Sequence, residues 1–149
     1  MRRSLLGVLI LIISLTACDA AVGGPSPTAA PTPYPTPVGG LGHRPSTPVK
    51  ITLLSPTSGE VVHGTSVLVK VSITGGIVTT VTTRDITPTK GHVHLYLDNQ
   101  LIFMSYTLQQ LITVKPGLYS MYAEFVAQDH YFFQPRDVTP TVFFTVAPG

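Results

Sequence analysis

The segment Gly91-His92-Val93-His94-Leu95-Tyr96-Leu97-Asp98 places two imidazoles two residues apart. Side chains alternate along a β-strand, so the two histidines share one face while Val93, Leu95 and Leu97 share the other. The histidine Cβ atoms would then lie about 6.5 to 7 Å apart, and both rings could reach one metal ion. A zinc or copper site needs three or four ligands, so this pair is an incomplete site.

A third ligand must come from another part of the chain. His130 is the best candidate, because Asp129-His130 follows a long strand in a loop that can approach the neighbouring edge. We therefore take His92, His94 and His130 as a candidate copper or zinc site. The alternative, which the pattern favours, is that the histidine strand presents a polar sheet face that holds no metal.

The hairpin after the histidine strand decides whether a methionine could join this site. A two-residue turn at Asn99-Gln100 would place Leu95 opposite Met104 and Tyr96 opposite Phe103. In that register Met104 faces the core, and we interpret it as a packing residue rather than a copper ligand. Only a turn that changes the parity of the pairing would bring Met104 to the histidine face. The pair of Tyr96 and Phe103 would lie on the outer face.

From residue 49 onward, short β-branched and aromatic runs alternate with Pro, Gly and Asp, and no stretch keeps helical periodicity for three turns. This pattern predicts an all-β domain over residues 49–149. Seven or eight short strands in about 100 residues indicate an immunoglobulin-like antiparallel β-sandwich. The expected strands are Val49–Leu54, Ser66–Ile73, Ile77–Thr83, His92–Asp98, Leu101–Tyr106, Gln109–Val114, Leu118–Gln128 and Thr139–Val146.

Two residues near the predicted strand that starts at Leu118 have expected structural roles. Pro116-Gly117-Leu118-Tyr119 resembles the start of a strand with a tyrosine corner, in which the phenol bonds back to the preceding loop. Met121 shares the more apolar face of that strand with Tyr119, and we expect it in the core.

The histidine strand, the Pro-Gly turn and Asp129-His130 together resemble a group of bacterial exported immunoglobulin-like domains. Those domains carry Gly-His-x-His-x-Tyr-x-Asp-Gly, then a proline-glycine turn, then Asp-His. Here Asn99 replaces the glycine after the aspartate, and Tyr119 stands where members of the group often have a histidine. The resemblance implies the fold and export, and the missing histidine weakens the metal hypothesis.

The N-terminus predicts export and lipidation. A short positive start, the apolar run from Leu5 to Ile13 and small residues before Cys18 form a signal peptide over residues 1–17. The run is too short for a permanent membrane helix, which needs about 20 residues. Leu15-Thr16-Ala17-Cys18 resembles the lipobox of bacterial lipoproteins. We therefore expect Cys18 to carry lipid and to hold the protein on the extracytoplasmic side of a cell membrane.

Residues 18–48 contain eight of the fourteen prolines and almost no bulky apolar side chains between Ala20 and Pro48. Such a segment cannot form a core, and its Pro-Thr repeats favour extended polyproline II conformation. We expect a disordered, semi-stiff stalk that lifts the sandwich off the membrane.

Charge and motifs narrow the function classes. Removing Arg2 and Arg3 with the signal peptide leaves 9 − 2 = 7 basic residues against 7 acidic ones. A neutral chain has no electrostatic footprint for nucleic acid. No Gly-x-Ser-x-Gly elbow or paired carboxylates indicate an enzyme. The sequence therefore predicts a displayed, non-enzymatic binding or adhesion module for a protein or glycan ligand; the alternative is a copper or zinc carrier.

Overall fold

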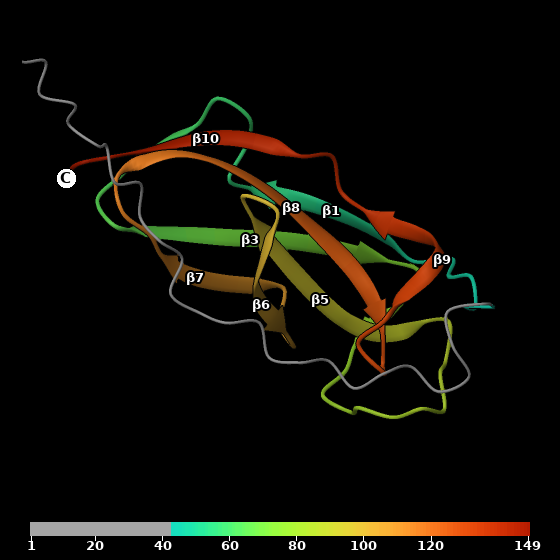
Figure 1. The fold of residues 1–149 in the computed structure, drawn as a ribbon. Coiled ribbons are helices and arrows are strands. Elements are labelled where there is room, and N and C mark those ends of the chain that lie inside the picture. The colour runs from blue at the N-terminus through green and yellow to red at the C-terminus, as the bar shows by residue number, and fades with distance from the viewer. Residues whose placement is uncertain (1–42) are drawn as a thin grey trace, which may run out of the picture.

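The computed structural model describes residues 43–149, so the predicted signal peptide, Cys18 and the linker up to residue 42 lie outside the described residues. None of the described residues forms a helix long and apolar enough to cross a membrane. The regular elements of this part are ten strands (Figure 1). They are β1 (Lys50–Ser55), β2 (Val61–His63), β3 (Ser66–Thr74), β4 (Ile77–Val78), β5 (Lys90–Leu97), β6 (Gln100–Ser105), β7 (Gln109–Thr113), β8 (Gly117–Ala127), β9 (Phe132–Val138) and β10 (Val142–Ala147).

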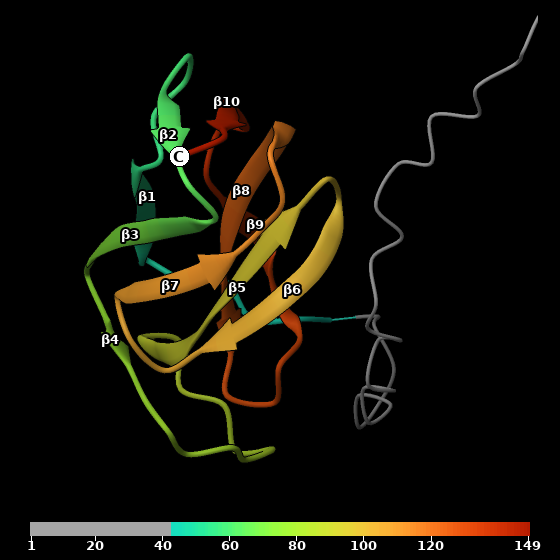
Figure 2. The ribbon, with the colours of Figure 1, turned by 90° about the vertical axis from the view of Figure 1, so that its left-hand side faces the viewer.

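The strands form two sheets that pack face to face. The small sheet has the order β1-β3-β7, and the large sheet has the order β2-β10-β8-β5-β4, with β6 added beside β5 and β9 beside β8. The hairpin of β5 and β6 runs along one side of the large sheet (Figure 2). This architecture confirms the predicted all-β, immunoglobulin-like sandwich, with more strands than the seven or eight expected.

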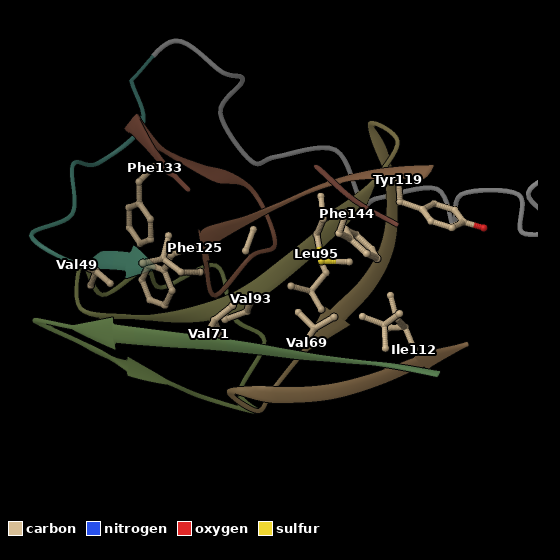
Figure 3. Packing of buried hydrophobic residues seen from close by; sticks show 14 of the residues in the cluster. Val49, Val69, Val71, Val93, Leu95, Ile112, Tyr119, Phe125, Phe133 and Phe144 are labelled. Carbon is tan, nitrogen blue, oxygen red and sulfur yellow. The ribbon is translucent and has the colours of Figure 1, made fainter. Parts of the chain in front are cut away.

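The core lies between the two sheets. Val69 and Val71 of β3 face Val93 and Leu95 of β5, and Phe125 of β8 closes one end (Figure 3). All five side chains are buried, as the period-two pattern of β3 and β5 predicts. Full burial of each such side chain stabilises the fold by about 1.5 to 3 kcal/mol.

The predictions for Met121 and Tyr119 are confirmed. Met121 is fully buried in the core. The Tyr119 hydroxyl donates a hydrogen bond of 2.8 Å to the carbonyl oxygen of Lys115, which is the geometry of a tyrosine corner.

Strands β2 and β9 were not expected, and the strand predicted over Ile77–Thr83 is only two residues long. The β9 segment contains Pro135, which lacks a backbone donor and argues against a strand in a sequence pattern. It fits here because β9 pairs with β8 alone among the described strands, so one side of its backbone needs no ladder partner.

The predicted register of the β5–β6 hairpin is wrong. The turn residues are Asp98 and Asn99, because Leu97 pairs with Gln100. Both turn residues have positive φ, 49° and 63°, the conformation that tight hairpins require and that Asp and Asn tolerate better than Gln. The side chain of Asp98 also accepts a hydrogen bond of 2.8 Å from the backbone N–H of Ser120, which holds the turn against β8.

This register, with a bulge between Leu95 and Tyr96, changes which side chains share a face. Met104 lies opposite His94, and Phe103 lies opposite Leu95. The prediction that Met104 faces the core is therefore wrong, as is the predicted pair of Tyr96 and Phe103. The parity change that brings Met104 to the histidine face is therefore present, but the bulge produces it rather than the turn, which still has two residues.

Residues 44–48, which the sequence interpretation placed in the linker, contact the sandwich. The Arg44 side chain is 5% exposed and forms a bidentate ion pair with Asp129, with both N–O distances at 2.7 Å. The backbone N–H of Gln134 donates to the Pro45 carbonyl oxygen at 2.9 Å, and the Thr47 hydroxyl donates to that of Pro88 at 2.6 Å. The chain therefore joins the domain at Arg44.

Candidate functional site

The two histidines of β5 lie on the face of the large sheet that points away from the core, as strand alternation predicts. Their surroundings differ from the prediction, because His92 is 0% exposed and His94 is 2% exposed. The β8–β9 loop, at residues 128–131, covers this part of the sheet near the segment that follows β4 (Figure 1). The predicted polar, solvent-facing surface is therefore absent at these two positions.

The β8–β9 loop also supplies His130, the predicted third residue. His130 has a positive φ of 66°, a conformation uncommon outside glycine, and its backbone N–H donates to the Ala127 carbonyl oxygen at 2.9 Å. Its ring stacks on His92 with a centroid distance of 4.3 Å and lies 5.9 Å from the ring of His94. The three residues proposed from the sequence thus form one imidazole cluster.

The imidazoles of this cluster are neutral at pH 7. The pKa of His94 is lowered to about 3. Burial is the largest cause, and the neighbouring His130 and His92 contribute in the same direction. Burial is also the main cause that lowers the pKa of His92 and of His130. A neutral imidazole keeps one nitrogen lone pair, which is the form that binds metals.

Hydrogen-bond geometry separates the roles of His92 and His130. The Nδ1 and Nε2 atoms of His92 face the carbonyl oxygens of Thr79 at 2.8 Å and Gln128 at 3.3 Å. A neutral ring has one N–H, so His92 can donate to one of these carbonyl oxygens at a time, and both of its nitrogens face protein backbone. In His130, Nε2 contacts the Thr82 hydroxyl at 3.1 Å, and the buried Nδ1 has no hydrogen-bond partner within residues 43–149.

Beside the cluster lies an open hollow of about 150 Å³. Its walls come from β5, β8, β9 and the β8–β9 loop, so it occupies the outer face of the large sheet. The lining residues are His94, Tyr96, Glu124, Val126, His130, Tyr131, Phe132 and Arg136.

A buried carboxylate holds the floor of this hollow. Glu124 is 1% exposed and accepts hydrogen bonds from Nε and Nη2 of Arg136, each at 2.6 Å. The Tyr96 hydroxyl donates to the same carboxylate at 3.2 Å, and burial together with Glu124 raises the Tyr96 pKa. The Arg136 guanidinium also lies over the Phe132 ring at 5.7 Å. These contacts fix four of the lining side chains.

The ion pair between Arg44 and Asp129 holds the part of the wall that contains Tyr131 and Phe132. Besides its two bonds to Asp129, Arg44 donates from Nε to the Phe132 carbonyl oxygen at 3.0 Å and lies over the Tyr131 ring at 5.7 Å. Asp129 in turn accepts from the Tyr131 backbone N–H at 3.2 Å. The β8–β9 loop that carries His130 is therefore held from both sides.

Sequence reasoning missed Glu124 and Arg136. Glu124 had a usable signal, since it is the one charged residue in the eleven-residue strand Gly117–Ala127. A charge in such a strand has to be paired when it is buried. Its partner, Arg136, follows Pro135 in a segment whose sequence does not predict a strand.

The described part of the chain contains no formed three-histidine metal site. Among residues 43–149, no three His, Cys, Asp or Glu side chains are arranged to hold one metal ion. His63 lies at the end of β2 and is exposed, as is His43. The histidines at 92, 94 and 130 are the ones that meet.

No protein-family model and no curated protein sequence matches the chain. Solved structures similar to it include fibronectin(III)-like modules of Clostridium thermocellum CbhA, with 19% identity and a TM-score of 0.47 over 66% of this chain and 46% of that one. Another is the CARDB domain of a Pyrococcus furiosus protein in complex with di-metal ions, with 11% identity and a TM-score of 0.40 over 70% of this chain and 95% of that one. Both are distant likenesses of fold, and the match spans less than half of the first.

Proposed function

We propose that this chain is a non-enzymatic binding protein, held on the extracytoplasmic side of a cell membrane by lipid on Cys18, whose sandwich binds its ligand in the hollow beside the imidazole cluster. The observation that carries this proposal is the preorganised hollow itself, with the Glu124–Arg136 pair in its floor and Arg44–Asp129 behind its wall. Side chains that are already fixed lose little freedom when a ligand binds.

The polar groups in and beside the hollow already have partners within the protein, which supports recognition rather than catalysis. Both oxygens of Glu124 are occupied by Arg136 and Tyr96, and both nitrogens of His92 face backbone carbonyls. A general acid or base must exchange a proton with its substrate, which groups bonded in this way do poorly.

The character of the hollow indicates the part of the ligand that it accepts. The charges of Glu124 and Arg136 cancel, the imidazoles are neutral, and Phe132 with Tyr131 supplies aromatic surface. Small ligand sites combine apolar walls with a few fixed polar groups in this manner. We expect a small, uncharged polar group, such as the end of a glycan or of a capped peptide.

The position of Arg44 relates the hollow to the tether. Arg44 contacts Asp129, Tyr131 and Phe132, so the predicted stalk meets the sandwich beside the hollow. The C-terminus lies at the other end, where Gly149 approaches Gly64 (Figure 1). The ligand site would thus be at the tethered end of the module.

Fragment binding by NMR tests the hollow as a ligand site. We expect neutral fragments, including methyl glycosides and acetylated dipeptides, to shift the signals of His94, Tyr96 and Phe132 in residues 18–149 carrying Cys18→Ser. Phe132→Ala should weaken this binding about tenfold, because a buried aromatic contact is worth more than about 1 kcal/mol. Phe143→Ala is the matched control, since Phe143 is exposed on β10 outside the hollow. Fragments that bind outside the hollow, with an affinity that Phe132→Ala leaves unchanged, would contradict the proposal.

Labelling with an alkyne fatty acid in a lipoprotein-making bacterium tests the tether. The full chain should incorporate the label, and Cys18→Ala should lose it completely, because the sulfur of Cys18 is the atom that accepts the lipid. Secretion of an unlabelled mature chain would show that residues 1–17 are an ordinary signal peptide and would remove the anchor from the proposal.

A copper or zinc carrier that uses His92, His94 and His130 is the second candidate. The observation in its favour is the stacking of the three neutral rings, and the hydrogen bonds of His92 count against it. Calorimetric titration of residues 18–149 carrying Cys18→Ser with copper(II) and with zinc tests this candidate. Binding at one ion per chain that the His92→Ala/His94→Ala double variant loses would support it, and equal binding in both proteins would remove it.

A further inference from the structure

We infer that the outer face of the large sheet holds a site for a soft monovalent metal ion, copper(I), with His94, His130 and Met104 as ligands. The inference goes beyond the proposed function, because it adds a metal ion at the imidazole cluster beside the hollow. It replaces His92 of the predicted set by a thioether from β6.

The register of β5 and β6 supplies the thioether. Met104 is the Cα partner of His94 in an antiparallel pair, so the two side chains stand on the same face with Cβ atoms about 4.5 to 5.5 Å apart. Met104 is only partly buried, so its sulfur is not consumed by the core. Met121, by contrast, is fully buried between the sheets.

His130 supplies a buried nitrogen, Nδ1, that makes no hydrogen bond within the described residues. Its Nε2 contacts the Thr82 hydroxyl at 3.1 Å, and because a hydroxyl accepts as well as donates, His130 can carry its proton on Nε2. The lone pair then resides on Nδ1, the buried atom without a hydrogen-bond partner in the described residues. The ring of His130 lies 5.9 Å from that of His94 at an interplanar angle of 16°, so one of the two side chains has to rotate before both rings can face one ion.

The ligand types select the ion. Thioethers are soft ligands that favour copper(I), whereas zinc and copper(II) prefer imidazole, carboxylate and thiolate. Two imidazoles and one thioether give a neutral set, which leaves less uncompensated charge in a buried position with a monovalent ion than with a divalent one.

His92 would then act as a positioning residue. Its ring stacks on His130 at 4.3 Å, and its nitrogens lie against the carbonyl oxygens of Thr79 and Gln128, one of which can accept its N–H. It thereby fixes the loop that presents His130, without contacting the ion itself.

Anaerobic competition against a chromophoric copper(I) chelator tests this assignment on untagged residues 18–149 carrying Cys18→Ser, which removes the unlipidated thiol as a competing ligand. We expect one copper(I) per chain. Met104→Leu should weaken the affinity about tenfold or more, since even the loss of an outer-shell partner typically costs 10- to 100-fold. Met121→Leu is the matched control and should leave the affinity unchanged. In the natural chain, the methyl signal of Met104 should shift with copper(I) and that of Met121 should not.

The outcomes separate this inference from the wider proposal. Copper(I) affinity that is equal in Met104→Leu and the natural chain overturns the inference. So does the absence of copper(I) binding. Copper(II) or zinc binding that depends on His92 and His94 but not on Met104 overturns it in favour of the three-histidine carrier. The fragment experiment on the hollow is independent of these titrations, so the binding-module proposal stands or fails by itself.

Discussion

Lowering the pH from 7 to 4 is expected to reduce the free energy of unfolding by about 3 kcal/mol through His94 alone. The pKa of His94 is about 3 in the folded protein, chiefly because of burial, against 6.5 as the reference for an exposed histidine. The unfolded chain takes up a proton near pH 6.5, whereas the folded chain does so only near pH 3. Stability therefore falls as the pH drops below 6.5, and the loss through this residue levels off below about 3.

His92 and His130 should add to the acid effect. Burial lowers the pKa of each, so their contributions have the same sign as that of His94. A proton on one of the three rings also makes protonation of its neighbours less favourable, since the His130 ring lies 4.3 Å from that of His92 and 5.9 Å from that of His94. The cluster should therefore respond to acid as a unit rather than as three independent groups.

Urea unfolding at pH 7, 6, 5 and 4 measures this effect. The natural chain should lose about 3 kcal/mol more between pH 7 and pH 4 than His94→Gln does, because glutamine does not titrate. The comparison uses the pH-dependent difference, so it holds even where the variant is less stable at pH 7. His63→Gln is the control, since His63 is exposed, and it should follow the natural chain. Parallel curves for His94→Gln and the natural chain would show that His94 is accessible to protons when folded.

The sequence was informative where local chemistry decides the structure. The alternation of Val93 and Leu95 with histidines was enough to assign the two faces of β5, because one face had to be apolar. Pro116-Gly117 followed by Tyr119 was enough to predict the tyrosine corner. The meeting of His130 with the β5 histidines could also be expected, since a loop after a neighbouring strand has few other places to go.

The hairpin register could not be read from the sequence because two adjacent turns were plausible. Asp98-Asn99 and Asn99-Gln100 both contain residues that tolerate positive φ. The structure selects the first, in which the Asp98 carboxylate binds the Ser120 backbone N–H on a different strand. The choice of turn alone keeps Met104 on the core face, and the bulge between Leu95 and Tyr96, which a single sequence does not announce, moves it to the histidine face.

The burial of the histidines was also beyond local reasoning. His92 and His94 are covered by a loop held by Arg44, a residue more than forty positions away in a segment whose composition resembles a linker. The Glu124–Arg136 pair joins two strands whose ladder is irregular, with a shift between Phe125 and Val126. Contacts of this kind depend on how the sheet is assembled, and a single sequence gives no signal for them.

The other large effect is expected at Gly91, the residue before the first histidine of the strand. Gly91 pairs with Ala127 at the end of the ladder between β5 and β8, and a Cβ built on it would lie 2.0 Å from the backbone oxygen of Val126. The same atom would lie 2.8 Å from Cζ of Phe125. A backbone oxygen in a sheet ladder cannot move aside as a flexible side chain can, so β5 and β8 would have to separate. This displacement would reach the imidazole cluster, since His92 is the next residue.

Gly91→Ala is therefore expected to cost more than about 4 kcal/mol, a loss that marks a specific structural clash rather than an ordinary substitution. Gly117→Ala provides the control, because its added Cβ would meet only the Tyr119 ring at 3.5 Å, an ordinary contact, and should cost less than about 1 kcal/mol. Urea unfolding of both variants, or loss of soluble folded protein for Gly91→Ala alone, is the measurement. A Gly91→Ala variant within about 1 kcal/mol of the natural chain would mean that β5 and β8 can part at little cost. The close approach of these two strands would then not be what holds the histidines in place, and their burial would have to depend on the loops and ion pairs above them.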